Sequence, residues 1–391
     1  MGASGSSSNF LDMALDGHKS GQKHTKNHRR LQLPRFLCVF IPFVATSPSA
    51  QLIAAKSDFQ RALRAWYRVH ARPLPWRETP SLYHTVVSEF MLQQTQVKTV
   101  LPYLARWLTA LPDFAALAAA PESRVLKLWE GLGYYSRARN LHRLAKTVAA
   151  WPELRHTPEA WRELPGVGPY TAAAITSISF DAPAACVDGN VVRILARLTA
   201  DATPFRDSAG ASKAFAPLAA ALLPATHPGD HNQAMMELGA TVCFRQKPLC
   251  LTCPVRGFCA GARCGDPEAF PRLAPKQIEQ RSVTRVWCER DGSLLLHRSA
   301  AGARRFANIH ELPAADQAGF DVAMVARGEL LAKKRRGITR FQITESIHAV
   351  PARPGKLPAG LVWVPLAELE TLTLSGPHRR WVAEILARRQ P

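Results

Sequence analysis

The string Leu164-Pro-Gly-Val-Gly-Pro-Tyr-Thr-Ala172 decides the fold of the first large part of the chain. Two glycines two residues apart, between segments of helical periodicity, allow a tight hairpin between two helices. The amides of Gly166, Val167 and Gly168 then point outward at the start of the second helix, where they bind one phosphate without reading sequence. A plain helix–turn–helix connection remains the alternative for this string taken alone.

A cysteine run further along the chain adds a second constraint. Cys243, Cys250, Cys253 and Cys259 stand in a C-x6-C-x2-C-x5-C pattern. Its wide first gap and tight later gaps suit a [4Fe-4S] cluster better than a zinc knuckle, which pairs its ligands as two C-x2-C hairpins. A zinc site or a disulfide pair is the alternative on spacing alone.

Charge and cysteine content point to a polyanionic partner in a reducing compartment. The 391 residues include 50 Lys+Arg against 30 Asp+Glu, a formal net charge of +20. Such an excess favours salt-sensitive association with nucleic acid, although a basic solvated surface gives the same composition. Eight cysteines, four of them clustered, fit the cytoplasm rather than a secreted disulfide scaffold.

Periodicity divides the chain into a mainly α part over residues 56–265, a linker over 266–281 and an α+β part over 282–391. The first part is expected to hold helices over 83–108, 122–128, 137–150, 158–162, 170–177, 191–198, 211–223 and 231–243, after one that starts near Ser57 and ends before Pro73. The second part is expected to hold strands over 282–287, 293–296, 340–343 and 361–364, then a helix over 377–387.

Residues 1–55 are expected to be a disordered extension. They hold a basic polar stretch, then a short apolar run over 36–44 and a small-residue segment over 45–50. The apolar run is too short for a membrane span, although the order of these segments also matches an export signal. We expect a monomeric protein without a membrane partner.

A series of motifs resembles the helix–hairpin–helix DNA glycosylases that carry an iron–sulfur cluster, and more narrowly the adenine DNA glycosylases of the MutY family. Besides the hairpin and the cysteines, the matching strings are Leu74-Pro-Trp-Arg77, Ser88-Glu-Phe-Met-Leu-Gln-Gln-Thr-Gln-Val97, Gly131-Leu-Gly-Tyr-Tyr-Ser-Arg-Ala-Arg-Asn140, Val187-Asp-Gly-Asn-Val191 and Asn232-Gln-Ala-Met-Met-Glu-Leu-Gly239. They run in the family order. The resemblance implies a mainly α helix–hairpin–helix glycosylase domain with a [4Fe-4S] cluster loop, followed by an α+β Nudix-like domain.

Two carboxylates carry the implied chemistry. Cleaving an adenine N-glycosidic bond needs a proton on the leaving base and a negative charge near the oxocarbenium-like sugar. Glu89 lies in an apolar helical segment, where burial would keep it protonated, although a solvated helix position is the alternative. By resemblance, Glu89 protonates adenine N7 and later activates water. Asp188, which an ordinary helix N-cap would also explain, stabilises the sugar with support from Asn190.

The implied substrate is duplex DNA with adenine opposite 8-oxoguanine or guanine. Adenine must leave the stack to be cut, so the protein needs a pocket and a wedge. Trp76, Arg77 and Gln233 match the family's pocket for the extruded adenine. The positions that match those entering the duplex are Leu92, Gln93, Gln94 and Tyr134. Core packing is the alternative for Tyr134, and a solvated helix face is the alternative for Gln94.

Tyr170 bears on the reaction type. Endonuclease III-like enzymes have a lysine at this hairpin position, which forms a Schiff base and nicks the strand. Tyr170 has no amine, and its hydroxyl is expected to reach Glu89. The sequence therefore predicts a monofunctional glycosylase; an endonuclease III-like enzyme acting on oxidised pyrimidines and a non-catalytic DNA-binding protein are the alternatives.

The C-terminal part resembles the family's Nudix-like recognition module through Val364-Pro-Leu-Ala-Glu-Leu369 and Leu374-Ser-Gly-Pro-His378. It lacks the Nudix catalytic pattern, so no pyrophosphohydrolase activity is expected. The family's Phe-Ser-His turn, which reads 8-oxoguanine, is also missing. Thr344, Ser346 or His348 are the candidates to replace it.

Overall fold

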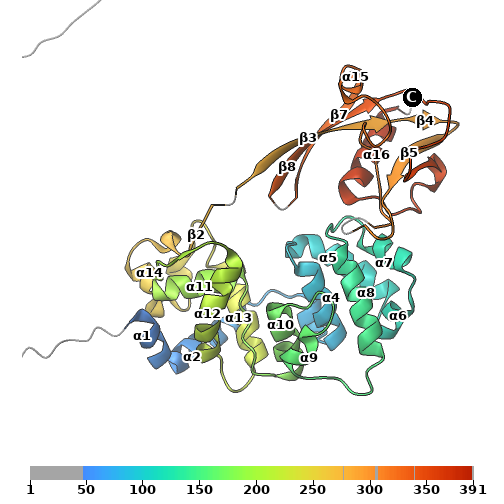
Figure 1. Cartoon of the computed structure of the whole chain (residues 1–391). Coiled ribbons are helices and arrows are strands. Elements are labelled where there is room, and N and C mark those ends of the chain that lie inside the picture. Colours follow the sequence, from blue (N-terminus) through green and yellow to red (C-terminus); the bar gives the residue numbers. More distant parts are fainter. Residues whose placement is uncertain (1–46, 276, 304–306, 339, 390–391) are drawn as a thin grey trace, which may run out of the picture. The chain divides into compact units, whose positions relative to one another are not determined.

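The computed structural model describes residues 47–275, 277–303, 307–338 and 340–389. Between residues 48 and 263 the described chain is helical, and the helices lie in two groups (Figure 1). One group holds α3 (Pro75–Glu78), α4 (Leu82–Leu92), α5 (Val97–Ala110), α6 (Phe114–Ala119), α7 (Glu122–Trp129), α8 (Ser136–Ala149), α9 (Pro158–Arg162) and α10 (Pro169–Phe180). The other holds α1 (Pro48–Ala54), α2 (Lys56–His70), α11 (Gly189–Thr199), α12 (Ser208–Leu222), α13 (Pro228–Thr241) and α14 (Ala260–Arg263).

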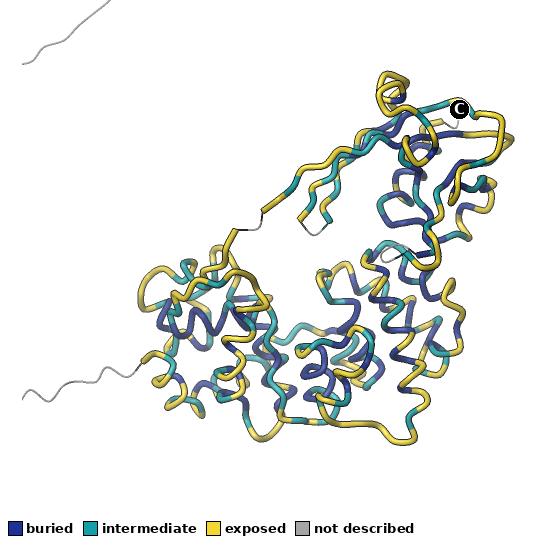
Figure 2. Tube along the Cα trace, viewed as in Figure 1, coloured by how far each residue is buried: buried dark blue, intermediate teal, exposed yellow. Residues whose placement is uncertain are grey.

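Each helical group has its own apolar core. The first is built around fully buried Trp107, Trp129 and Trp161, and the second around Phe59 and Leu195. Figure 2 shows the buried residues gathered on the inner faces of the helices and the exposed ones along the outer loops. Burial of large side chains at about 25 cal/mol per Å² is the main stabilising term for such packing.

The expected helices are present, α3, α6 and α14 are additional helices that were not expected, and two boundaries differ from the expectation. Residues 83–108 do not form one helix: α4 ends at Leu92, and Gln94 has a positive φ of 56° before α5 starts at Val97. The folded chain also begins earlier than expected, because Pro48–Ala54 form α1 and bury Leu52 in the second core. Residues 1–46 of the expected extension lie outside the described residues.

The hairpin joins α9 to α10. Gly166 has a φ of 78°, and a Cβ there would lie 2.6 Å from the Asn140 side chain, so only glycine fits this turn. Val167 donates its amide to Leu164 O at 3.2 Å. Of the three amides predicted to bind phosphate, the one of Val167 is therefore used within the turn, and those of Gly166 and Gly168 have no backbone partner in the described chain.

The C-terminal part is α+β, as expected. Its longer strands are β3 (Glu279–Trp287), β5 (Ser293–Arg298), β7 (Leu330–Ile338), β8 (Phe341–Ala349) and β9 (Leu361–Pro365). Strand β8 lies between parallel β3 and antiparallel β7, while β9 pairs with β5. Helix α16 (Gly376–Arg389) closes the chain. Strand β3 starts within the expected linker, and β7 was not expected from the sequence.

A buried charged group lies inside this C-terminal part. The wholly buried Glu345 accepts a hydrogen bond from Arg285 Nε at 2.7 Å and pairs with Arg336. His378 accepts from the Leu312 amide at 2.9 Å and faces Glu311 at 3.3 Å. Burial lowers the pKa of His378 well below its usual value, so this ring is neutral at pH 7.

No helix within the described ranges combines the length and the apolar composition that crossing a bilayer takes.

Candidate active site

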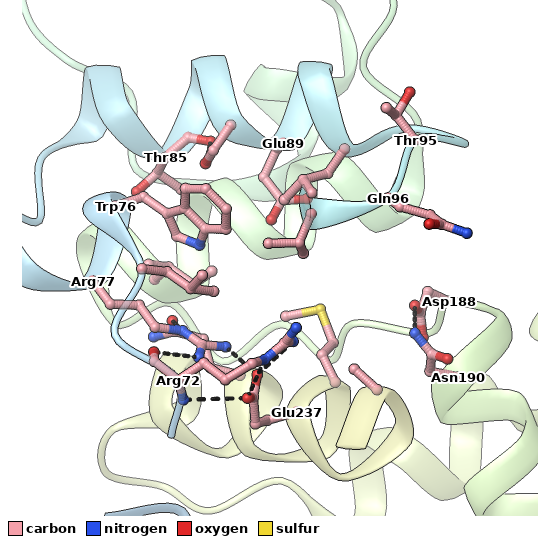
Figure 3. Close-up of a pocket in the computed structure, with 18 of the residues that line it drawn as sticks. Arg72, Trp76, Arg77, Thr85, Glu89, Thr95, Gln96, Asp188, Asn190 and Glu237 are labelled. Atoms are coloured by element: carbon pink, nitrogen blue, oxygen red, sulfur yellow. Dashed lines mark hydrogen bonds and ion pairs between the residues drawn. The ribbon is translucent and has the colours of Figure 1, made fainter. Parts of the chain in front are cut away.

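A cavity of about 540 Å³ lies where the two helical groups meet. It is lined from the first group by residues of α3, α4, α5 and α10, and from the second by residues of α11 and α13. Figure 3 shows Glu89 pointing from α4 into this cavity, with Asp188 and Asn190 on the α11 side and Glu237 on α13. The predicted site residues that line it are Trp76, Arg77, Glu89, Leu92, Tyr170, Asp188, Asn190 and Gln233.

Glu89 is a buried carboxyl. Helix α4 is capped by Ser81, whose hydroxyl accepts from the His84 amide at 3.1 Å, and its residues 83 and 85–91 are buried. Burial raises the pKa of Glu89 from 4.5 to about 7; the nearby Asp188 also raises it, while Tyr170 and Arg77 lower it. A carboxyl with this pKa is suited to general acid catalysis at neutral pH.

Asp188 caps α11. One of its carboxylate oxygens accepts from the Val191 amide at 2.8 Å and the other from Asn190 Nδ2 at 3.0 Å. Burial raises the pKa of Asp188 above its usual value, and these hydrogen bonds oppose that effect. The N-cap interpretation is thus confirmed. Asp188 also lines the cavity, and its role beside the sugar stays a prediction.

Gly239 fixes the distance between α11 and α13. A Cβ at Gly239 would lie 2.5 Å from Asn190 Cβ, closer than side chains pack. The missing side chain therefore lets α13 approach α11 at the level of Asp188 and Asn190.

Tyr170 lies at the start of α10, between the two sides of the cavity. Its hydroxyl is 3.0 Å from Met236 Sδ, and it also hydrogen-bonds with Glu89. Burial and the neighbouring Glu89 raise the pKa of Tyr170 well above 10, so the hydroxyl stays protonated.

Sequence reasoning missed a second buried carboxylate at the floor of the cavity. Glu237 has no exposed side-chain surface and accepts from Arg72 Nε at 2.6 Å and from Arg77 Nη2 at 3.0 Å. Arg77 Nε donates in turn to Gln233 Oε1 at 3.2 Å. Glu237 stands in the motif that contains Gln233, four residues later, so helical spacing was the available signal.

The remaining predicted DNA-contacting residues lie outside this cavity. Gln93, partly buried, donates to Thr171 Oγ1 at 3.4 Å. Gln94 is exposed, and Tyr134 is 42% exposed with a positive φ of 47°. An aromatic side chain left in solvent on a strained backbone does not serve core packing, which argues against that alternative for Tyr134.

The four cysteines of the run line one small cavity of about 30 Å³ and are free thiols. Buried Arg197 lies against them: its guanidinium donates to Cys243 Sγ at 3.2 Å and to Arg245 O at 2.9 Å. Within the described ranges no three His, Cys, Asp or Glu side chains converge on a position for a single metal ion. Four thiols around one cavity nevertheless form a donor set suited to a cluster several ångström wide.

Comparisons with known proteins identify the class. The family model described as "HhH-GPD superfamily base excision DNA repair protein" matches residues 87–208, which include Glu89, the hairpin and Asp188. The part of the helical region that carries these residues is therefore similar to this superfamily. The chain is also similar in sequence to curated adenine DNA glycosylases.

Two relatives show the extent of this similarity. Adenine DNA glycosylase of Rattus norvegicus is 43% identical over 250 residues, which cover 61% of this chain and 48% of the relative. That of Mycolicibacterium smegmatis is 38% identical over 196 residues, covering 49% of this chain and 66% of the relative. The chain thus spans about half the length of the mammalian relatives it matches, 48% in rat and 42% in Mus musculus.

Among solved structures, a thermostable thymine-DNA glycosylase is 26% identical with a TM-score of 0.47, covering 54% of this chain and 98% of that chain.

Proposed function

We propose that this chain is a DNA glycosylase that removes adenine mispaired with 8-oxoguanine or guanine from duplex DNA and leaves the strand intact. The observation that carries the proposal is Glu89, a buried carboxyl with a pKa of about 7 in a cavity that it shares with Asp188. A non-catalytic DNA-binding protein would have no use for a carboxyl held near half-protonation.

The two carboxylates have distinct tasks in this proposal. Glu89 donates its proton to N7 of the extruded adenine, which makes the base a better leaving group. The sugar then gains positive charge, and ionised Asp188 stabilises it across the cavity. In such sites, different surroundings give the two carboxyl groups different pKa values, so that one acts as the acid while the other stays ionised.

Gln233, at the floor of the cavity, distinguishes adenine from guanine. Because Gln233 Oε1 accepts from Arg77, the Gln233 amide nitrogen is left as a donor. Adenine offers a bare ring nitrogen to such a donor, whereas guanine offers an N–H at the same edge, and two donors repel. Glu237, held by Arg72 and Arg77, keeps this arrangement fixed.

A panel of duplexes tests the proposal. Incubation followed by hot alkali is expected to cut strands that held adenine opposite 8-oxoguanine or guanine, and to leave A·T and oxidised pyrimidines uncut. Release of oxidised pyrimidines instead would establish the endonuclease III-like alternative. Single-turnover rates on the two adenine mispairs measure the preference for 8-oxoguanine. Of the three candidates to read that base, Thr344 and Ser346 are partly exposed and His348 is buried.

The same panel without alkali tests the absence of strand nicking. We expect intact strands and no adduct on borohydride reduction, since the hairpin position is Tyr170. Lys98 is exposed and supplies an amine among the residues that line the cavity. An adduct that disappears in Lys98→Met would contradict the monofunctional assignment.

We further propose that Cys243, Cys250, Cys253 and Cys259 hold a [4Fe-4S] cluster. When bound, the cluster would tie together the ends of the 243–259 loop by thiolate ligation, with Arg197 donating to one ligand. The role is structural, and no step of base release passes through it.

Replacing one ligand tests this centre. Protein purified without oxygen is expected to contain about four iron and four sulfide ions per chain. Cys253→Ala is expected to lose both, together with the broad visible absorption of the cluster. Cys264→Ala, which changes an exposed free cysteine outside the run, is the matched control and should keep them. One zinc per chain in the wild type would establish the zinc alternative.

A further inference from the structure

Arg137, in the first turn of α8, is a buried cation whose hydrogen-bond acceptors in the described chain are all backbone carbonyls. It is 6% exposed. Its Nη1 donates to the carbonyls of Phe90 (3.1 Å), Met91 (2.8 Å) and Gln93, and its Nη2 to those of Leu132 (3.1 Å) and Gly133 (3.3 Å). No carboxylate pairs with it in the part of the chain that the structure describes, so salt-bridge formation does not explain this burial.

The carbonyls that hold Arg137 come from two separate segments. Three lie at the C-terminal end of α4, one to four residues after Glu89, and two lie in the loop that follows α7. Helix α8 packs against both α4 and α7, so its first turn faces both segments (Figure 1). Carbonyls at the C-terminal end of a helix carry partial negative charge and substitute for a counter-ion. Burial lowers the pKa of Arg137 to about 10, so the side chain is still a cation at neutral pH.

Each segment contains a residue with strained backbone directly after a carbonyl bound by Arg137. Gln93 precedes Gln94, whose φ is 56°, and Gly133 precedes Tyr134, whose φ is 47°. A left-handed conformation costs a non-glycine residue about 1–3 kcal/mol, so the surroundings must hold it. The Arg137 guanidinium also lies 5.5 Å from the centre of the Tyr134 ring.

We propose that Arg137 is a positioning residue that holds Gln94 and Tyr134 in their left-handed conformations and ties both to the helix of Glu89. This inference rests on the proposed function, in which these two side chains enter the duplex while Glu89 receives the adenine. A single guanidinium thereby links extrusion of the base to the position of the proton donor.

Lysine at this position would not do the same. A guanidinium presents its donors in a rigid planar fork, which here spans two segments at once. A lysine ammonium has three donors at one point and is more strongly hydrated, so it cannot satisfy both sets of carbonyls from a buried position. Arg137→Lys therefore keeps the charge and removes the link between the two segments.

The test compares Arg137→Lys with Arg143→Lys. Arg143 lies on the same helix, is exposed and donates to Asn140 Oδ1 at 2.6 Å, so it is a matched control. Extrusion is followed by the fluorescence of 2-aminopurine placed opposite guanine, and chemistry by single-turnover adenine release across pH.

For Arg137→Lys we expect adenine release to fall by about 10²-fold, the usual effect of misplacing a reacting group by roughly 1 Å. The fluorescence gain on binding should fall in parallel. The midpoint of the pH profile should stay near its wild-type position, because burial of Glu89 sets it. Arg143→Lys should match the wild type in all three measurements.

Other outcomes separate the possible failures. If folded Arg137→Lys extrudes 2-aminopurine as well as the wild type, the positioning role is wrong. If it does not fold, Arg137→Gln, which keeps two donors and removes the buried charge, is measured instead; failure of both to fold makes Arg137 a requirement of the fold and overturns the proposal. If the wild type extrudes 2-aminopurine but releases no adenine, the proposed function fails, while loss of extrusion in Arg137→Lys still supports the positioning role.

Discussion

Glu89→Gln is expected to bind mismatched duplex like the wild type and to release adenine about 10⁴-fold more slowly, the upper range for loss of a general acid. Glutamine keeps the size and polarity of the side chain but cannot donate a proton to N7. Single-turnover release and binding to the same duplex measure the two effects separately. Glu159→Gln, on the exposed face of α9, is the control and should leave both unchanged.

The pH dependence of the wild type follows from the same group. Glu89 must be protonated to act, and its pKa is about 7. The single-turnover rate should therefore be level below pH 7 and fall about tenfold per pH unit above it. A rate that rises through this range would show that the ionised form of Glu89 is the active one.

Although Glu89→Gln should lose activity, it should gain folding stability relative to the wild type at high pH. The pKa of Glu89 is about 7 in the folded protein against an ordinary value of 4.5, so the folded state binds more protons than the unfolded state between these values. The contribution of Glu89 to the free energy of unfolding is therefore fully present below pH 4.5 and is lost as pH rises through 7. Urea unfolding should find Glu89→Gln more stable than the wild type by about 3 kcal/mol at pH 8, and this gain should shrink toward pH 5.

Asp188→Asn is expected to lower adenine release by about 10³-fold, because it removes the charge that stabilises the sugar. Asparagine is an equally good N-cap, so α11 and the stability of the protein should be little affected. Single-turnover kinetics together with thermal unfolding separate the two roles of this side chain.

Asp207→Asn is the matched control for this substitution. Asp207 caps α12 in the same manner, accepting from the Gly210 amide at 2.8 Å, and is exposed away from the cavity. It should keep wild-type activity. A large loss of stability in Asp188→Asn without a loss of rate would leave Asp188 as a helix cap and remove it from the mechanism.

Much of the helical part could be predicted because its information is local. The α9 helix begins and ends where periodicity placed it, and α7 differs by one residue. Apolar periodicity placed Glu89 on a helix but left a buried and a solvated position open, and the structure buries it. The break at Gln93–Gln96 was missed because apolar residues continue on both sides of it, and the carbonyls exposed by the break are satisfied by Arg137, which is distant in the sequence.

The rest depended on contacts that no local pattern reports. Strand β7 contains Lys333-Lys334-Arg335-Arg336, and two of its partly buried positions, Lys334 and Arg336, are charged. Lys334 pairs with Glu384, and Arg336 with the buried Glu345. The alternation of apolar residues does not detect a strand whose inward side chains are cations paired with carboxylates of other elements. Glu237 was missed for the same reason, since its two arginines come from another helix and the preceding loop.

The enclosed charges around Glu345 restrict how the C-terminal part can diverge among descendants. Losing Arg285 or Arg336 alone leaves the buried Glu345 with one of its two cations and is destabilising, whereas exchanging the whole set for apolar side chains can be neutral. We therefore expect Glu345, Arg285 and Arg336 to be replaced together in related proteins. The solvent-facing positions of the same strands can change one at a time.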